Sequence, residues 1–111
     1  MKKVFGTLAV LTILAVSSYA QRGWKWPEDS AMRVKAEEKN VIQSDAVKMA
    51  DYKTALPALK WLFTNTPDLN KSIYINGAKV YDNLADAEND EARKAQLVDS
   101  LMWVYDQRIQ N

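Results

Sequence analysis

Hydrophobic residues beyond position 27 recur at intervals of three and four residues, which is typical of amphipathic helices. The clearest stripe consists of Tyr52, Ala55, Leu56, Leu59, Leu62 and Phe63. Pro57 lies early in this stripe, where a proline costs a helix much less than it does further along. We therefore predict a mildly kinked helix that begins near Asp51 or Tyr52 and ends at residues 65–68.

Three other segments show helical patterns. Residues 30–50 contain no Gly or Pro and carry apolar residues at near-helical spacing, so we predict a helix there and leave an interruption near Asn40 open. Asn70 is a good cap for a helix over 71–84, and residues 89–91 can cap a last helix over 91–109. Because the alternation typical of strands is nearly absent, we predict an all-α fold of antiparallel helical hairpins.

The first twenty residues have the pattern of a secretory signal peptide. A basic start at Lys2 and Lys3 precedes an apolar run over 4–16, and the small residues Ser18 and Ala20 follow. An uncleaved membrane anchor is the alternative, but a spanning helix needs about 20 apolar residues. We predict cleavage after Ala20, no transmembrane span afterwards, and a periplasmic or envelope-associated protein. Residues 21–29 then form an irregular segment before a helical domain over 30–111.

The composition argues against most chemistry. The chain contains neither His nor Cys, which removes the commonest general base, the commonest metal ligand and any disulfide. Without Lys2 and Lys3, thirteen basic residues face fourteen acidic ones, and they are interspersed rather than clustered, so nucleic acid is not an expected partner. The acidic residues over 82–91 lack the spacing of a calcium loop. We predict no catalytic residue, no metal and no cofactor.

Residues 50–67 resemble the second half of a tetratricopeptide repeat. In that family an aromatic residue begins the second helix, an alanine packs at the tightest crossing and a proline ends the unit, and Tyr52, Ala55 and Pro67 match in register. A repeat period is about 34 residues. Counted from Gln43, one period reaches Gly77, which then stands at the small-residue position in the first helix of the second repeat unit. The resemblance implies two hairpins stacked as a tetratricopeptide-like solenoid.

The match has departures. Gln43 occupies the small-residue position of the first unit, Asn76 stands where leucine is usual, and the second unit has a longer connection without a closing proline. A generic bundle of helical hairpins is the alternative. The chain also resembles the start of exported helical-repeat proteins from Bacteroidetes-type bacteria, through segments 26–29, 61–67, 69–77 and 105–109. That resemblance implies an envelope-associated scaffold with no known chemistry.

The length of the array raises a further expectation. About three repeat units are usually needed for stability, and this chain offers about two. Either the chain is a fragment of a longer array, or its last helix docks on itself or on a partner. Trp103 marks the surface where a further repeat would dock.

The tetratricopeptide resemblance also implies a binding groove. In that family residues of the first helices line a groove that holds a peptide. Carried over by position, the groove residues here are Asn40, Ser44, Lys71, Tyr74, Ala78 and Tyr81, with Glu37 and Val47 beside them. Asn40 and Lys71 would hydrogen-bond the backbone or a carboxylate of the peptide. The alternative is a solvated helix face with part-buried tyrosines.

Trp24, Trp26 and Trp61 suggest a second kind of site. Exposed tryptophans can form a platform for a glycan or a partner. Alternatively, Trp24 and Trp26 fold back over the first helix pair, and Trp61 packs against a neighbouring hairpin. Our main hypothesis is a non-enzymatic scaffold or adaptor of the bacterial cell envelope, which binds another envelope protein or further repeats of the same chain. A carbohydrate- or envelope-polymer-binding module is the alternative.

Overall fold

The structure is a computed structural model and describes residues 23–110. It contains four helices: α2 (Ser30–Lys48), α3 (Tyr52–Asn65), α4 (Ser72–Ala87) and α5 (Glu91–Gln110). No strand occurs within these residues, so the prediction of an all-α fold is confirmed for this part of the chain. The predicted signal peptide, residues 1–20, lies outside the described residues.

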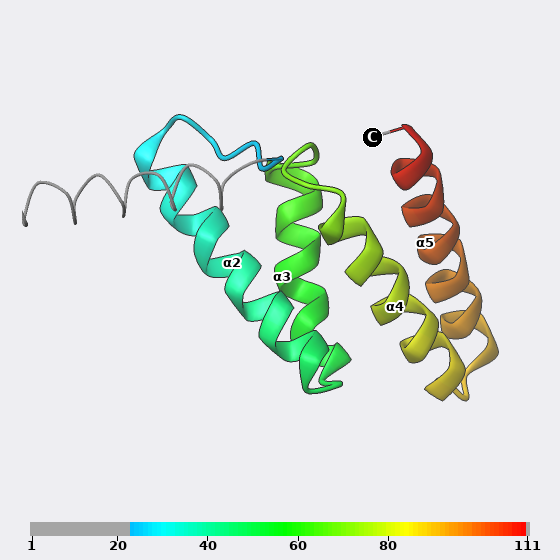
Figure 1. The fold of residues 1–111 in the computed structure, drawn as a ribbon. Helices are drawn as coiled ribbons and strands as arrows, with labels where there is room; N and C mark the ends of the chain where they lie inside the picture. The colour runs from blue at the N-terminus through cyan, green and yellow to red at the C-terminus, as the bar shows by residue number, and fades with distance from the viewer. Residues whose placement is uncertain (1–22, 111) are drawn as a thin grey trace, which may run out of the picture.

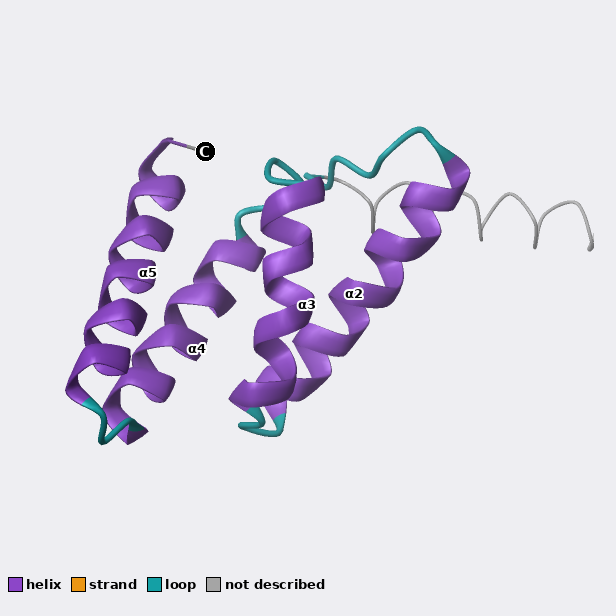
Figure 2. Cartoon of the chain, turned by 180° about the vertical axis from the view of Figure 1, so that it is seen from behind, coloured by secondary structure: helices purple, strands orange, loops and turns teal. Residues whose placement is uncertain are grey.

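The helices form two antiparallel hairpins, α2–α3 and α4–α5. α3 packs against α4, and α2 also touches α4. Figures 1 and 2 show the helices in chain order across the molecule, with α5 at one edge. The turns within the two hairpins lie at one end, and the α3–α4 loop and residues 23–29 lie at the other.

Each helix begins at a polar side chain that accepts a hydrogen bond from a backbone N–H of the first turn, at 2.8 to 3.4 Å. These side chains are the N-caps Asp29 of α2, Asp51 of α3 and Asp90 of α5, and for α4 they are replaced by Asn70, which precedes the N-cap Lys71 and accepts from the N–H of Ser72. Such caps satisfy backbone donors that the helix itself leaves unpaired. α2 runs through Asn40 without a break, and α3 continues through Pro57.

The turn between α2 and α3 is closed by backbone hydrogen bonds. The N–H of Ala50 donates to the Val47 carbonyl at 3.0 Å, and the N–H of Asp51 donates to the Ala46 carbonyl at 2.8 Å. This is the pattern of a Schellman motif, which needs a left-handed residue after the helix. Ala50 takes that conformation, with φ of 57°. The turn sets Asp51 where it caps α3.

The core lies where α4 meets its neighbours, and Gly77 makes its closest contact possible. A Cβ atom built on Gly77 would lie 2.6 Å from Cζ of Phe63 on α3, closer than packed carbon atoms allow. The Phe63 ring also stacks on Tyr74, with ring centroids 5.0 Å apart. Gly77 therefore permits the close approach of α3 to α4. Residues with no exposed surface around this contact include Leu59, Leu62, Leu69, Ile73 and Val80.

A polar contact joins the two hairpins inside this core. The Nδ2 of Asn76 donates to the Oε1 of Gln43 at 2.9 Å, and the Nε2 of Gln43 donates to the Oδ1 of Asn40 at 2.9 Å. Gln43 is only 1% exposed, so these bonds satisfy an amide that would otherwise be costly to bury. The two departures from the repeat pattern thus pair with each other and link α2 to α4.

Candidate functional site

Three of the predicted groove residues are buried in the core. Tyr74, Ala78 and Tyr81 on α4 are 1%, 7% and 5% exposed. α5 covers this face, because the Trp103 ring lies 6.3 Å from the Tyr74 ring and Ser100 hydrogen-bonds to Tyr81. The prediction that these three residues line an open groove is wrong, since the α4–α5 hairpin closes over them.

The two tyrosines act as neutral polar anchors within that contact. Burial raises the pKa of Tyr74 above its ordinary value, and the nearby Asp68 carboxylate raises it further. The Tyr74 hydroxyl donates to the backbone carbonyl of Pro67. Burial also raises the pKa of Tyr81, and the Ser100 hydrogen bond offsets part of that change. Both phenols therefore keep their protons over the ordinary pH range.

The other three predicted groove residues keep some accessible surface. Asn40 and Ser44 are partly exposed on α2, although the side-chain oxygen of Asn40 already accepts the bond from Gln43. Lys71 is exposed and lines a hollow of about 300 Å³. The residues around that hollow are Gly23, Lys25, Pro67, Asp68, Asn70, Lys71 and Tyr74. Neither Asn40 nor Ser44 belongs to this set, so the hollow is not the predicted groove.

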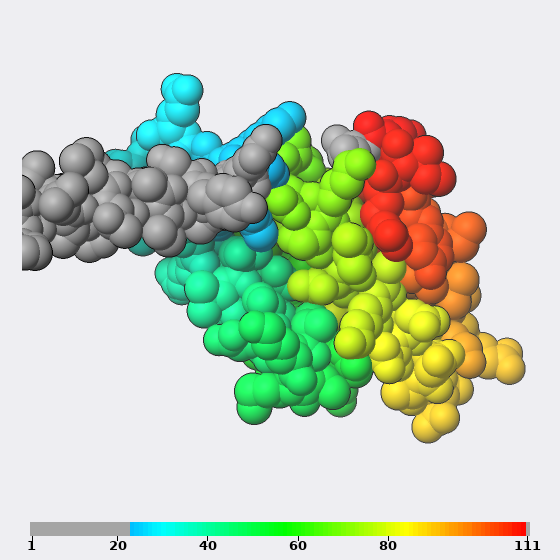
Figure 3. All heavy atoms as spheres, viewed as in Figure 1, coloured from blue at the N-terminus to red at the C-terminus, as the bar shows by residue number. Residues whose placement is uncertain are grey.

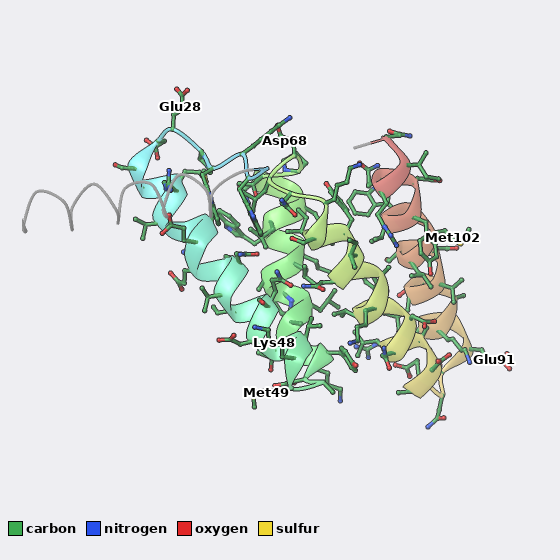
Figure 4. All side chains as sticks on the ribbon, in the orientation of Figure 1. Glu28, Lys48, Met49, Asp68, Glu91 and Met102 are labelled. Atoms are coloured by element: carbon green, nitrogen blue, oxygen red, sulfur yellow. The ribbon has the colours of Figure 1, made fainter. Side chains whose placement is uncertain are left out.

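The segment that carries the first two tryptophans is tied to the α3–α4 loop. The N–H of Lys25 donates to the Leu69 carbonyl at 2.8 Å, and the Nδ2 of Asn70 donates to the Gly23 carbonyl at 2.9 Å. Figure 4 shows Asp68 of the same loop beside this segment. The two bonds hold residues 23–27 over the end of the helices, and Leu69 is buried beneath them.

Trp24 and Trp26 stack on each other rather than standing apart. Their ring centroids are 5.3 Å apart and their planes differ by 8°. Both are half-buried against the core, as is Trp61, and the guanidinium of Arg33 lies 5.8 Å from the Trp26 centroid. Among the residues the structure describes, Trp61 makes no ring contact with either of them. The three tryptophans agree with the packing interpretation, and the glycan platform stays a prediction.

A cleft of about 800 Å³ lies at the end of the molecule that carries the hairpin turns. We name it the α3–α5 cleft, because the first half of α3 and the start of α5 form its two walls and the end of α4 forms its base. Its lining residues are Lys53, Leu56, Pro57, Lys60, Leu84, Ala87, Glu88, Asn89, Arg93 and Leu97.

The cleft combines an apolar floor with a positive rim. Leu56, Leu84 and Leu97 form the floor and pack against the core from their inner side. Lys53 and Lys60 stand on the α3 wall, and neither makes an ion pair with any residue between 23 and 110. Apolar surface beside unpaired cations can hold a chain that offers both apolar and acidic side chains.

Arg93 supplies the third cation, on the α5 wall. Its Nε lies 3.7 Å from the Oε2 of Glu88, the only acidic residue in the lining. The Arg93 side chain is well exposed, and exposed ion pairs of this length contribute little. Arg93 therefore remains able to exchange Glu88 for a carboxylate of a partner.

A second accessible apolar surface runs along α5. Val98, Met102, Tyr105 and Ile109 are 40%, 57%, 41% and 85% exposed, and we name them the α5 stripe. Figure 4 shows Met102 on the outer side of α5, pointing away from α4. By contrast, Leu101 and Val104 are the buried residues of this helix.

The sequence interpretation missed the α3–α5 cleft. Lys53, Leu56 and Lys60 follow at helical spacing on one face, which is a visible signal of a mixed basic and apolar surface. That Arg93 and Leu97 stand opposite them depends on how α5 packs. Within residues 23–110 no group of three potential metal ligands occurs, and no helix is both long and apolar enough to cross a membrane.

Comparisons with known proteins supply no relative: no family model, no curated protein and no solved structure shows a significant match to this chain.

Proposed function

We propose that this chain is a non-enzymatic scaffold or adaptor of the bacterial cell envelope that holds a segment of another protein in the α3–α5 cleft. The observation that carries the proposal is the cleft itself, with an apolar floor at Leu56, Leu84 and Leu97 and the unpaired cations Lys53 and Lys60 above it. Its volume of about 800 Å³ lies within the range of ordinary binding sites. An amphipathic partner segment would bury apolar side chains on the floor and direct carboxylates to the rim.

The location follows from the N-terminal pattern. The basic start, the apolar run over 4–16 and the small residues at Ser18 and Ala20 support export by a cleaved signal peptide. The resemblance to exported helical-repeat proteins supports an envelope role. The partner would then be another envelope or periplasmic protein.

We also propose that the hairpins stack in the manner of tetratricopeptide units. Two observations support this: α3 packs between α2 and α4, and Gly77 lies at a close contact with Phe63 of the neighbouring hairpin. Ala55, at the position of the tightly packed alanine, has no exposed surface. One observation stands against a full match, because α5 covers Tyr74 and Tyr81, which the family resemblance places in an open groove.

A displayed library of random 16-residue peptides tests the function. We expect the selected peptides to combine Asp or Glu with apolar residues at helical spacing. Their affinity, measured by fluorescence anisotropy, should fall as salt is raised, because rim charges are screened. Lys53→Glu combined with Lys60→Glu should weaken binding by about tenfold or more.

The matched control is Lys35→Glu combined with Lys48→Glu, two exposed lysines on α2 outside the cleft. It makes the same change of net charge and should leave the affinity unchanged. Equal losses in both double variants would contradict the cleft as the site. Quenching of tryptophan fluorescence by oligosaccharides, without peptide binding, would favour the carbohydrate-binding alternative.

A further inference from the structure

The α5 stripe has the spacing of a coiled-coil seam. From Val98 the next members follow after four, three and four residues, at Met102, Tyr105 and Ile109. Alternating steps of three and four are those of the apolar positions in a heptad repeat. α5 therefore presents a straight apolar seam that a second helix can pack along.

The stripe is separate from both the core and the α3–α5 cleft. The core side of α5 is marked by Leu101 and Val104, and the cleft uses Arg93 and Leu97 near its start. Among the described helices, only α4 runs along α5. Figure 3 shows α5, from orange to red, as the edge of the molecule. The stripe is therefore accessible to another helix.

Charged residues flank the seam, with acidic residues on one side and basic residues on the other. Asp99 and Asp106 follow the stripe on one side, at the heptad positions next to Val98 and Tyr105. On the other side, Lys94 and Arg108 occupy two of the flanking positions, and the buried Leu101 occupies the one between them. All four charged residues are exposed, and none forms an ion pair with a residue that the structure describes. They are thus available to a partner helix.

These charges suit a second copy of α5 in parallel. In a parallel pair each flanking residue faces the one five positions further along in the other helix, so Lys94 faces Asp99 of the second copy. In an antiparallel pair, equivalent sides meet. Asp99 would then face Asp106 and Lys94 would face Arg108, which brings like charges together. The pattern therefore favours the parallel arrangement and opposes the antiparallel one.

We propose that two copies of this chain associate through the α5 stripe, with their α5 helices side by side and parallel. The contact is isologous, because each copy contributes the same four side chains. Each copy contributes four side chains of the stripe, far fewer than the roughly 20–30 residues per side of a standard stable interface. The dimer should therefore be weak, reversible and dependent on protein concentration.

Sedimentation velocity of the purified protein over a concentration series tests this proposal. The wild type should shift from monomer to dimer as concentration rises. Met102→Asp and Ile109→Asp should each raise the dissociation constant by about tenfold or more. Both side chains are exposed, so the monomer should keep its helical circular dichroism. Val34→Asp, at an equally exposed apolar position on α2, is the matched control and should dimerise like the wild type.

Charge exchange tests the direction. Asp99→Lys should weaken a parallel dimer, because Lys94 would then face a lysine, and adding Lys94→Asp should restore it. In an antiparallel dimer Asp99→Lys would instead strengthen association by removing the contact with Asp106, and that result would overturn the proposal. A monomer at concentrations up to about 1 mM, or a dimer unaffected by Met102→Asp, would also overturn it.

Discussion

The two helices of the second hairpin resemble each other in sequence pattern and differ in what the fold does with them. α4 has 16 residues and buries seven of them, whereas α5 has 20 residues and buries only Leu101 and Val104. Both carry an apolar stripe at helical spacing. The difference arises from their neighbours, because α4 packs against α2, α3 and α5, while α5 runs along α4 and touches α3 where Trp103 meets Phe63, with ring centroids 5.4 Å apart.

This contrast shows that an apolar stripe predicts a helix but does not predict what covers it. Ile73 on α4 and Ile109 on α5 are the same residue type in the same kind of helix, yet one has no exposed surface and the other is almost fully exposed. The α4 stripe holds the fold together. The α5 stripe stays exposed, and exposed apolar surface of this kind is where we propose that a partner binds.

The largest expected change in stability comes from replacing the buried Ile73, and the matched replacement of Ile109 should have almost no effect. Ile73→Ala should lower the free energy of unfolding by about 2–5 kcal/mol, because it removes buried methyl groups and leaves a cavity. Ile109→Ala should change it by less than about 0.5 kcal/mol. Urea denaturation followed by circular dichroism, at a protein concentration where the chain is monomeric, measures both. Equal losses would show that the end of α5 is covered in solution, and the contrast between the helices would fail.

A smaller effect is expected from a single methyl group. Gly77→Ala should destabilise the fold by about 1–3 kcal/mol, because the new Cβ would press against the Phe63 ring. In Gly77→Ala combined with Phe63→Leu, the second change should cost less than it does alone, as a double-mutant cycle would show. On the exposed side of α5, alanine should be more stable than glycine. Ala95→Gly should lower stability by about 1 kcal/mol, through helix propensity alone.

The smallest effect near neutral pH comes from the buried tyrosines of α4. Their folded-state pKa values are raised by burial, so the unfolded chain loses these protons first as the pH rises. Their contribution to stability is complete below about pH 10 and is lost as the pH rises through their folded pKa values. Tyr74→Phe combined with Tyr81→Phe should flatten the fall of the melting temperature above that pH. An unchanged slope would place the alkaline sensitivity elsewhere.

Local chemistry was enough to predict the helices. The Asp51 cap acts within three residues of the sequence, as does the bond from the Ser72 N–H to Asn70, although Asn70 stands one residue before the N-cap of α4. The apolar spacing repeats within one or two turns. The role of Gly77 could also be inferred from the sequence. A glycine inside a helix costs stability relative to alanine, so its presence there indicates that another group packs closely against it. The interruption near Asn40 that the sequence left open does not occur, since the residues on both sides of Asn40 continue the helix.

The candidate site depended on contacts between distant residues. Gln43 and Asn76 each looked like a departure from a repeat, and only the fold brings them together as a hydrogen-bonded pair. Tyr74 and Tyr81 seemed suited to a groove until α5 was placed over them. The α3–α5 cleft likewise needs Lys53 and Arg93 to face one another from different hairpins.

The helices, their ends and the apolar stripe on each can be read from the chain alone, because these features arise from interactions within a few residues. Which stripes are buried, which polar groups are paired and where a cleft remains depend on how the helices pack together. A side chain is covered by residues far away in sequence, so its own neighbours along the helix do not reveal whether it becomes buried, such as Ile73, or stays exposed, such as Ile109.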